Sequence, residues 1–86
     1  MSQEDKQRIT VEIYNRKYHI VGEESERHMQ LVADLVDQKM NEIHEVNKQL
    51  DTSSLAVLTA VNTMNDYLKL KEDYATLLGS IKKKED

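Results

Sequence analysis

The side chains of this chain that could carry out chemistry are three histidines and two pairs of carboxylates. His19 lies in a predicted strand, whereas His28 and His44 lie far apart in a predicted helix. A helical metal site needs two ligands on one face, usually at positions i and i+4, and no pair of these histidines has that spacing. We therefore predict no metal site and no cofactor.

The carboxylate pairs are Asp34 with Asp37 and Glu42 with Glu45, all in the same predicted helix. Paired carboxylates act as acid and base only where a pocket separates their pKa values. A chain of 86 residues leaves little room for such a pocket, and it has neither a glycine-rich phosphate loop nor a nucleophile elbow. We interpret the pairs as a solvated helix face and predict that the protein is not an enzyme.

The composition favours a small protein that self-associates. The formal net charge is -4 and no basic block is present, which argues against binding to nucleic acid. No apolar run is long enough to cross a membrane and no signal peptide opens the chain, so we expect a cytoplasmic protein with no membrane contact. Because there is no cysteine, disulfides cannot compensate for the small core, and oligomerisation is the remaining remedy.

An alternating segment near the N-terminus predicts a β-strand. After a disordered polar tail at residues 1–7, apolar β-branched side chains occupy every second position of residues 8–14. These side chains are Ile9, Val11 and Ile13. The pattern is typical of a strand with one buried face.

A tight turn and a second strand follow. Asn15 tolerates the left-handed backbone of a turn, so we place the turn at residues 15–17 and the second strand at residues 18–21. This turn would expose Arg16 and Lys17 to solvent. Because an isolated hairpin is only marginally stable, it must pack on a helix or join the strands of a partner.

A first helix is predicted from Ser25, a suitable N-cap residue, to about residue 45. Its apolar side chains recur at spacings of three and four, in a stripe wide enough to cover the hairpin. The stripe comprises Met29, Val32, Ala33, Val36, Met40 and Ile43. Leu31 and Leu35 lie off this stripe, either as ordinary exposed leucines or as a subunit contact.

The longest predicted element is a helix from residue 51, capped by Asp51, which would run about 45–50 Å and outreach the rest of the chain. It carries two seams with heptad spacing, displaced by about 100° around the helix. The first seam comprises Val57, Val61, Met64, Leu68, Lys71, Ala75 and Leu78. The second seam comprises Ala60, Thr63, Tyr67, Leu70, Tyr74, Leu77 and Ile81. Two seams at this offset favour a bundle with two neighbouring helices, contributed by several chains.

Together these elements predict an α+β fold. A β-hairpin packed on a helix forms a ββα head at residues 8–50, and a long coiled-coil oligomerisation helix follows at residues 51–86. The first helix should cover the long helix near Leu55 and Leu58. It is too short to cover the far end of the long helix.

Three segments carry a family resemblance. They are TVEIYNRKYHIVGEE in the hairpin, LVADLVDQKMNEI in the first helix and LDTSSLAVLTAVNTMNDYLKLKE at the start of the long helix. In this order they resemble the ZapA family of bacterial cell-division proteins, over residues 8–78. The resemblance implies a ββα head, dimers that pair through the coiled coil into a tetramer, and binding to the tubulin-like filament protein FtsZ. Bundling of FtsZ protofilaments would then stabilise the division ring at mid-cell.

The resemblance also implies where FtsZ binds, namely through charged residues in and after the hairpin turn. Arg16 matches the family's turn arginine, with Lys17 beside it, and His19 falls where the family often has a basic residue. His44 falls where some relatives carry a lysine of the same surface, and the family's turn glycine is Asn15 here. We therefore expect Arg16, Lys17, His19 and His44 to contact FtsZ.

Two other functions remain open from the residues alone. A coiled-coil adaptor would use the same bundle to bind a different cytoplasmic protein, by a helix in a groove or by strand addition. A small nucleic-acid-binding dimer would use the basic turn, although the acidic net charge counts against it.

Overall fold

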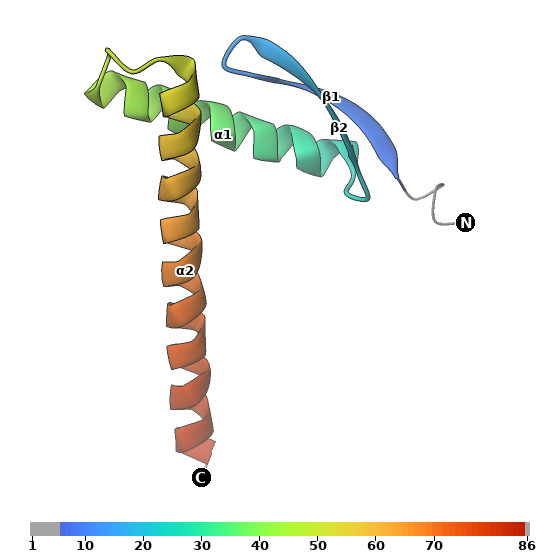
Figure 1. Cartoon of the computed structure of the whole chain (residues 1–86). Helices are drawn as coiled ribbons and strands as arrows, with labels where there is room; N and C mark the ends of the chain where they lie inside the picture. The colour runs from blue at the N-terminus through green and yellow to red at the C-terminus, as the bar shows by residue number, and fades with distance from the viewer. Residues whose placement is uncertain (1–5, 86) are drawn as a thin grey trace.

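A computed structural model describes residues 6–85 of the chain, with side chains from residue 6 to residue 80. In Figure 1 a hairpin lies along one helix, and a second helix leaves that helix at a steep angle. The elements are β1 (Gln7–Ile13), β2 (Arg16–Gly22), α1 (Glu26–Val46) and α2 (Thr52–Glu85). The predicted α+β order of a hairpin, a helix and a long helix is confirmed. Most of the predicted tail, residues 1–5, lies outside the described residues, and its last residue, Gln7, begins β1.

The hairpin turns at Tyr14 and Asn15, earlier in the chain than the sequence predicted. β1 and β2 are antiparallel, and Ile13 pairs with Arg16 across the end of the ladder. Both turn residues have a positive φ, 52° at Tyr14 and 68° at Asn15. A two-residue loop with this backbone follows the right-handed twist of the strands. The predicted turn at residues 15–17 is therefore wrong, because Arg16 already belongs to β2.

The inner face of the hairpin packs on α1. Ile9, Val11 and Ala33 form the core of this contact, and none of them is more than 3% exposed. Partly buried side chains pack against this core, namely Ile13, Ile20 and Met29. The alternation of apolar residues in β1 thus places one face of the strand on the helix, as predicted.

α1 begins and packs as the sequence predicted. The Ser25 hydroxyl accepts a hydrogen bond from the His28 amide at 3.1 Å, which caps the helix. Of the predicted stripe, Ala33 and Met40 are buried, Met29, Val36 and Ile43 are half-buried, and Val32 is 37% exposed. Leu31 and Leu35 are 56% and 55% exposed, so both lie on the surface of the single chain.

α2 buries side chains against α1 only in its first two turns. Leu55 and Thr59 are 1% and 5% exposed there, whereas Leu58 is 42% exposed. The prediction that α1 covers Leu58 holds only in part. Leu58 borders an open hollow with Glu42 and Ile43 of α1, but the two helices cross steeply and the Leu58 side chain stays largely uncovered (Figure 1). Every side chain from residue 60 to residue 80 is exposed.

Asp51 caps α2, as predicted. Its carboxylate accepts a hydrogen bond from the Ser54 amide at 2.8 Å. The backbone and side-chain hydrogen bonds from Ser54 lower the pKa of Asp51 below its ordinary value. The charged carboxylate therefore faces the free amides at the positive end of the helix.

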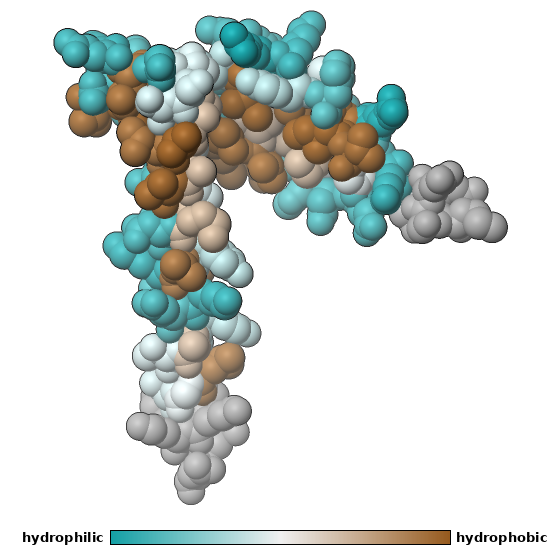
Figure 2. Space-filling view, viewed as in Figure 1, coloured by the Kyte–Doolittle hydropathy of each residue, from teal (hydrophilic) through white to brown (hydrophobic). Residues whose placement is uncertain are grey.

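Figure 2 shows hydrophobic side chains gathered where the hairpin, α1 and the start of α2 meet, with further ones along α2. The large apolar side chains of α2 that are exposed are Val57, Leu58, Val61, Met64, Tyr67, Leu68, Leu70, Tyr74, Leu77 and Leu78. A single chain thus leaves a long apolar surface uncovered, which is typical of a surface that binds another protein. Within residues 6–85, no helix is long and apolar enough to cross a membrane.

Candidate functional site

The hairpin turn is attached to α1 through Asp37. The backbone amide of Tyr14 donates a hydrogen bond to Asp37 Oδ1 at 2.6 Å, in a half-buried position. The side-chain amide of Asn41 donates to Asp37 Oδ2 at 3.2 Å and to the Asp37 carbonyl at 2.8 Å. Both carboxylate oxygens of Asp37 are therefore engaged, one by the turn and one by α1 itself.

The interpretation of Asp37 as part of a solvated helix face was wrong. Asp34, Glu42 and Glu45 are exposed, as that interpretation requires, but Asp37 is half-buried beneath the turn. The predicted turn is the sequence feature that could have indicated the role of Asp37. A two-residue loop leaves its first amide outside the strand ladder, and a half-buried amide needs an acceptor.

The Tyr14 side chain reaches a second position on α1. Its ring lies edge-on to the His44 ring, with the ring centroids 6.4 Å apart and the planes at 66°. Both side chains are half-buried. The contact places His44, which is far from the turn in sequence, beside the residue that opens the turn.

The predicted cationic residues divide between the two faces of the hairpin. Side chains alternate along a strand, and Arg16 pairs with Ile13, so Arg16 lies on the face that packs on α1. Lys17 and His19 alternate with it and lie on the opposite face. His19 Nδ1 lies 3.0 Å from the hydroxyl of Thr10, its cross-strand partner.

The structure therefore places Arg16, Lys17 and His44 near the turn, whereas His19 pairs with Thr10 at the middle of the strand ladder, and the four residues do not form one patch. Arg16, Lys17 and His19 are all exposed, whereas His44 is half-buried against Tyr14. Arg16 and His44 lie on the helix side of the turn, and Lys17 and His19 lie on the outer side.

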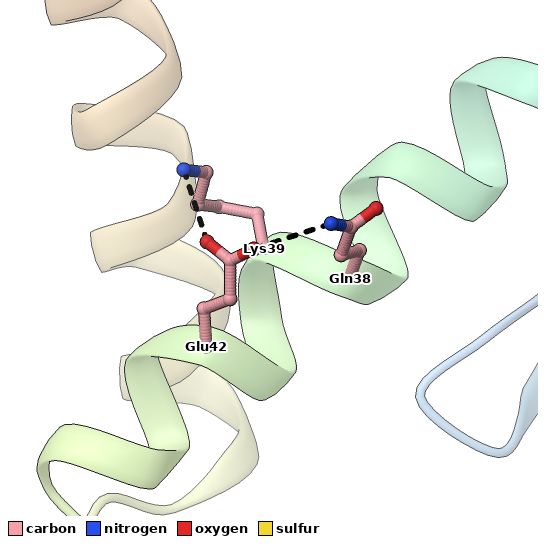
Figure 3. A network of polar contacts seen from close by, with 3 residues as sticks. All are labelled: Gln38, Lys39 and Glu42. Atoms are coloured by element: carbon pink, nitrogen blue, oxygen red, sulfur yellow. Dashed lines mark hydrogen bonds and ion pairs between the residues drawn. The ribbon is translucent and has the colours of Figure 1, made fainter.

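A second polar group lies in the angle between α1 and α2. Glu42 pairs with Lys39 at 3.3 Å and accepts a hydrogen bond from Gln38 at 3.3 Å (Figure 3). Lys39 and Glu42 line two open hollows in this angle, one with Thr63 and the other with Leu58. Lys39 and Glu42 thus place charged groups next to exposed apolar side chains. They do not form an enclosed site for acid–base chemistry.

The seam residues of α2 are exposed along the described helix. The exposed fractions range from 42% at Leu78 to 68% at Leu70 among its large apolar side chains. Lys71, which interrupts the first seam, places its ammonium 5.7 Å from the centroid of the Tyr67 ring in the second seam. Ile81, the last residue of the second seam, lies outside the described side chains.

Comparison with known proteins assigns the chain to a family. The family model described as Cell division protein ZapA matches residues 9–85. Cell division protein ZapA of Geobacillus sp. strain WCH70 is 54% identical over 86 residues, covering 100% of this chain and 99% of the relative. The protein of the same name from Bacillus licheniformis is 54% identical over 85 residues, covering 99% and 100%.

A solved structure agrees in fold. The ZapA mutant dimer from Geobacillus stearothermophilus matches with a TM-score of 0.75 and 49% identity, over 95% of each chain. The match spans the hairpin and both helices together, since so little of either chain is left out. The chain therefore belongs to the ZapA family of cell division proteins.

Proposed function

We propose that this protein is a non-enzymatic scaffold that binds FtsZ through its hairpin end and crosslinks FtsZ protofilaments. It would stabilise the division ring at mid-cell, in the cytoplasm. The observation that carries the proposal is the combination, in a ZapA-family chain, of exposed cations directly after the hairpin turn with a helix whose side chains are exposed from residue 60 to residue 80. A chain with such a helix needs further copies to cover it, and the resulting oligomer presents one hairpin turn from each copy.

The assembly would use the two seams of α2. We assign the contacts between chains to Val57, Val61, Met64, Leu68 and Leu78 of the first seam and to Tyr67, Leu70, Tyr74, Leu77 and Ile81 of the second. One seam would form a homodimer and the other would pair dimers, with residues 8–50 as the head and residues 51–86 as the rod. The exposed apolar side chains of α2 support this assignment, and the related solved structure from Geobacillus stearothermophilus is that of a mutant dimer.

Bivalence is the mechanism, and no catalysed step is needed. When one head of an assembled scaffold has bound a filament, the other heads are held near a second filament at high effective concentration. Modest affinity at each head is then enough to crosslink filaments. The rod fixes the separation, because α2 has 34 residues and spans about 50 Å.

The head contact would be partly electrostatic. Arg16 and Lys17 are exposed and follow the turn directly, His44 lies beside Tyr14 of the turn, and His19 lies further along β2. Exposed charges are screened at physiological ionic strength over about 8 Å, so binding should weaken as salt is raised.

The test is co-sedimentation with FtsZ and GTP. The native protein should increase the fraction of FtsZ that pellets as bundles, and Arg16→Glu should abolish this increase while leaving the oligomer intact. Arg27→Glu is the matched control, because Arg27 is exposed in the first turn of α1, away from the hairpin turn. It should bundle FtsZ normally.

The outcomes separate the site from the function. Normal bundling by Arg16→Glu would refute the proposed site. If the native protein does not affect FtsZ pelleting at all, the scaffold function is wrong and an adaptor for a different protein takes its place.

A further inference from the structure

The turn that carries the proposed FtsZ contact has a strained backbone. Tyr14 has a φ of 52°, which is uncommon for any residue with a side chain and unfavourable for an aromatic one. Such conformations persist where the surroundings fix them, and they concentrate at functional sites. The groups that fix Tyr14 are therefore of functional interest.

Two side chains of α1 hold Tyr14. Asp37 Oδ1 accepts a hydrogen bond from the Tyr14 amide at 2.6 Å. The His44 ring lies edge-on to the Tyr14 ring, with the ring centroids 6.4 Å apart. The contact with Asp37 is charge-assisted and half-buried, which makes it stronger than an exposed neutral hydrogen bond. Asn41 donates to the other oxygen of Asp37 and holds the carboxylate in place.

The position of the cations depends on this attachment. Arg16 and Lys17 follow Tyr14 by two and three residues, and Ile13 before it pairs with Arg16. If the Tyr14 amide were released, the end of the hairpin would be free to move relative to α1. The distance between Arg16 and His44 would then vary, because His44 is part of α1.

We propose that Asp37 is a positioning residue for partner binding, since it anchors the hairpin turn to α1 and fixes Arg16 and Lys17 relative to His44. The inference rests on the proposed function, because it concerns the same FtsZ-binding surface. Asp37 itself need not touch FtsZ. Its role is to remove conformational freedom that binding would otherwise have to remove.

The experiment compares Asp37→Ala with Asp34→Ala. The control removes the same charge from an exposed position one turn earlier on α1. Two quantities are measured for each assembled protein. The first is the rate of hydrogen exchange of the Tyr14 amide, followed by NMR, and the second is the concentration of the protein that gives half-maximal FtsZ bundling. Asp37→Ala should raise both by about tenfold or more, the factor expected from losing a hydrogen bond to a charged group. Asp34→Ala should match the native protein in both.

Asp37→Asn provides the rescue. Its side-chain oxygen can still accept from Tyr14 but carries no charge, so both quantities should fall between those of the native protein and Asp37→Ala. If Asp37→Ala does not fold, Asn41→Ala replaces it. That variant removes only the support of the carboxylate and should shift both quantities in the same direction by a smaller factor.

The results can overturn the inference without overturning the proposed function. Unchanged exchange at Tyr14 in Asp37→Ala shows that the hydrogen bond does not hold the turn. Faster exchange with unchanged bundling shows that Asp37 has only a structural role. In either case, loss of bundling in Arg16→Glu keeps the FtsZ-binding site in place. Normal bundling in Arg16→Glu overturns the proposed site and this inference with it, whereas the scaffold function fails only if the native protein does not bundle FtsZ.

Discussion

At the scale of single residues, the turn shows how few positions decide the shape of the hairpin. Tyr14 and Asn15 both have a positive φ, and neither is glycine. A left-handed backbone costs a residue with a side chain about 1–2 kcal/mol, less for asparagine than for tyrosine. The hydrogen bond from the Tyr14 amide to Asp37 offsets part of this cost.

Asn15→Gly should therefore stabilise the protein by about 0.5–1 kcal/mol, because glycine adopts the left-handed region without strain and is the preferred second residue of such a turn. Urea unfolding at one fixed protein concentration measures the change. Asn47→Gly is the contrasting variant. Asn47 has a φ of -138° and its side chain accepts a hydrogen bond from the Gln49 amide, so glycine should destabilise the protein there. A destabilised Asn15→Gly variant would show that the Asn15 side chain contributes more than its backbone strain costs.

Thr59 is a second residue with a definite energetic consequence. Its hydroxyl is buried between α2 and α1 and has no hydrogen-bond partner within the described chain. Thr59→Val keeps the shape of the side chain and removes the unpaired hydroxyl, so it should stabilise the protein by about 1 kcal/mol. Thermal unfolding compares it with Thr63→Val, one turn further along α2 and exposed, which should change stability by less than about 0.5 kcal/mol. Destabilisation by Thr59→Val would mean that the hydroxyl has a partner in the assembled protein.

At the scale of elements, local chemistry predicted the helix starts and tertiary contacts decided the rest. Ser25 and Asp51 cap α1 and α2 because a side-chain oxygen before a helix can accept from its free amides, which depends only on nearby residues. The burial of Ala33 and Met40 likewise follows from helical spacing. The core-facing sides of β1 and α1 were therefore predictable.

The errors have one physical origin. The turn lies at Tyr14 and Asn15, and not at residues 15–17, because Ile13 pairs with Arg16 across the ladder. The burial of Asp37 depends on where that turn meets α1. Leu58 is only partly covered where α1 crosses α2 steeply, and no spacing within α2 encodes the crossing angle. Contacts between distant segments fix these features, so periodicity along one segment could not reveal them.

The second seam of α2 makes a prediction at this scale. Leu70→Asp combined with Leu77→Asp should split tetramers into dimers, because each change places a charge in the proposed contact between dimers. Light scattering measures the mass. The control is Lys69→Asp with Thr76→Asp, also seven residues apart and exposed, on the side of α2 opposite both seams. An unchanged mass in the leucine variant would show that the second seam is not the contact between dimers.

At the scale of the whole molecule, the separation of tasks between the two ends is the main feature. The hairpin carries exposed cations directly after a turn that is hydrogen-bonded to α1, and α2 carries exposed apolar side chains away from it (Figures 1 and 2). The arrangement suits a protein that acts by holding two binding surfaces at a set distance.

Crosslinking is the central claim, and differential pelleting of FtsZ with GTP tests it most directly. Low-speed centrifugation collects bundles, whereas high-speed centrifugation also collects single filaments and whatever is bound to them. We expect dimers to pair antiparallel, so that only the tetramer carries heads at both ends of the rod. The Leu70→Asp and Leu77→Asp double variant should keep its heads but lose this pairing. It should remain with FtsZ in the high-speed pellet while the low-speed pellet falls to the level of FtsZ alone. Bundling by this variant at the native level, with its mass reduced to that of a dimer, would contradict the account.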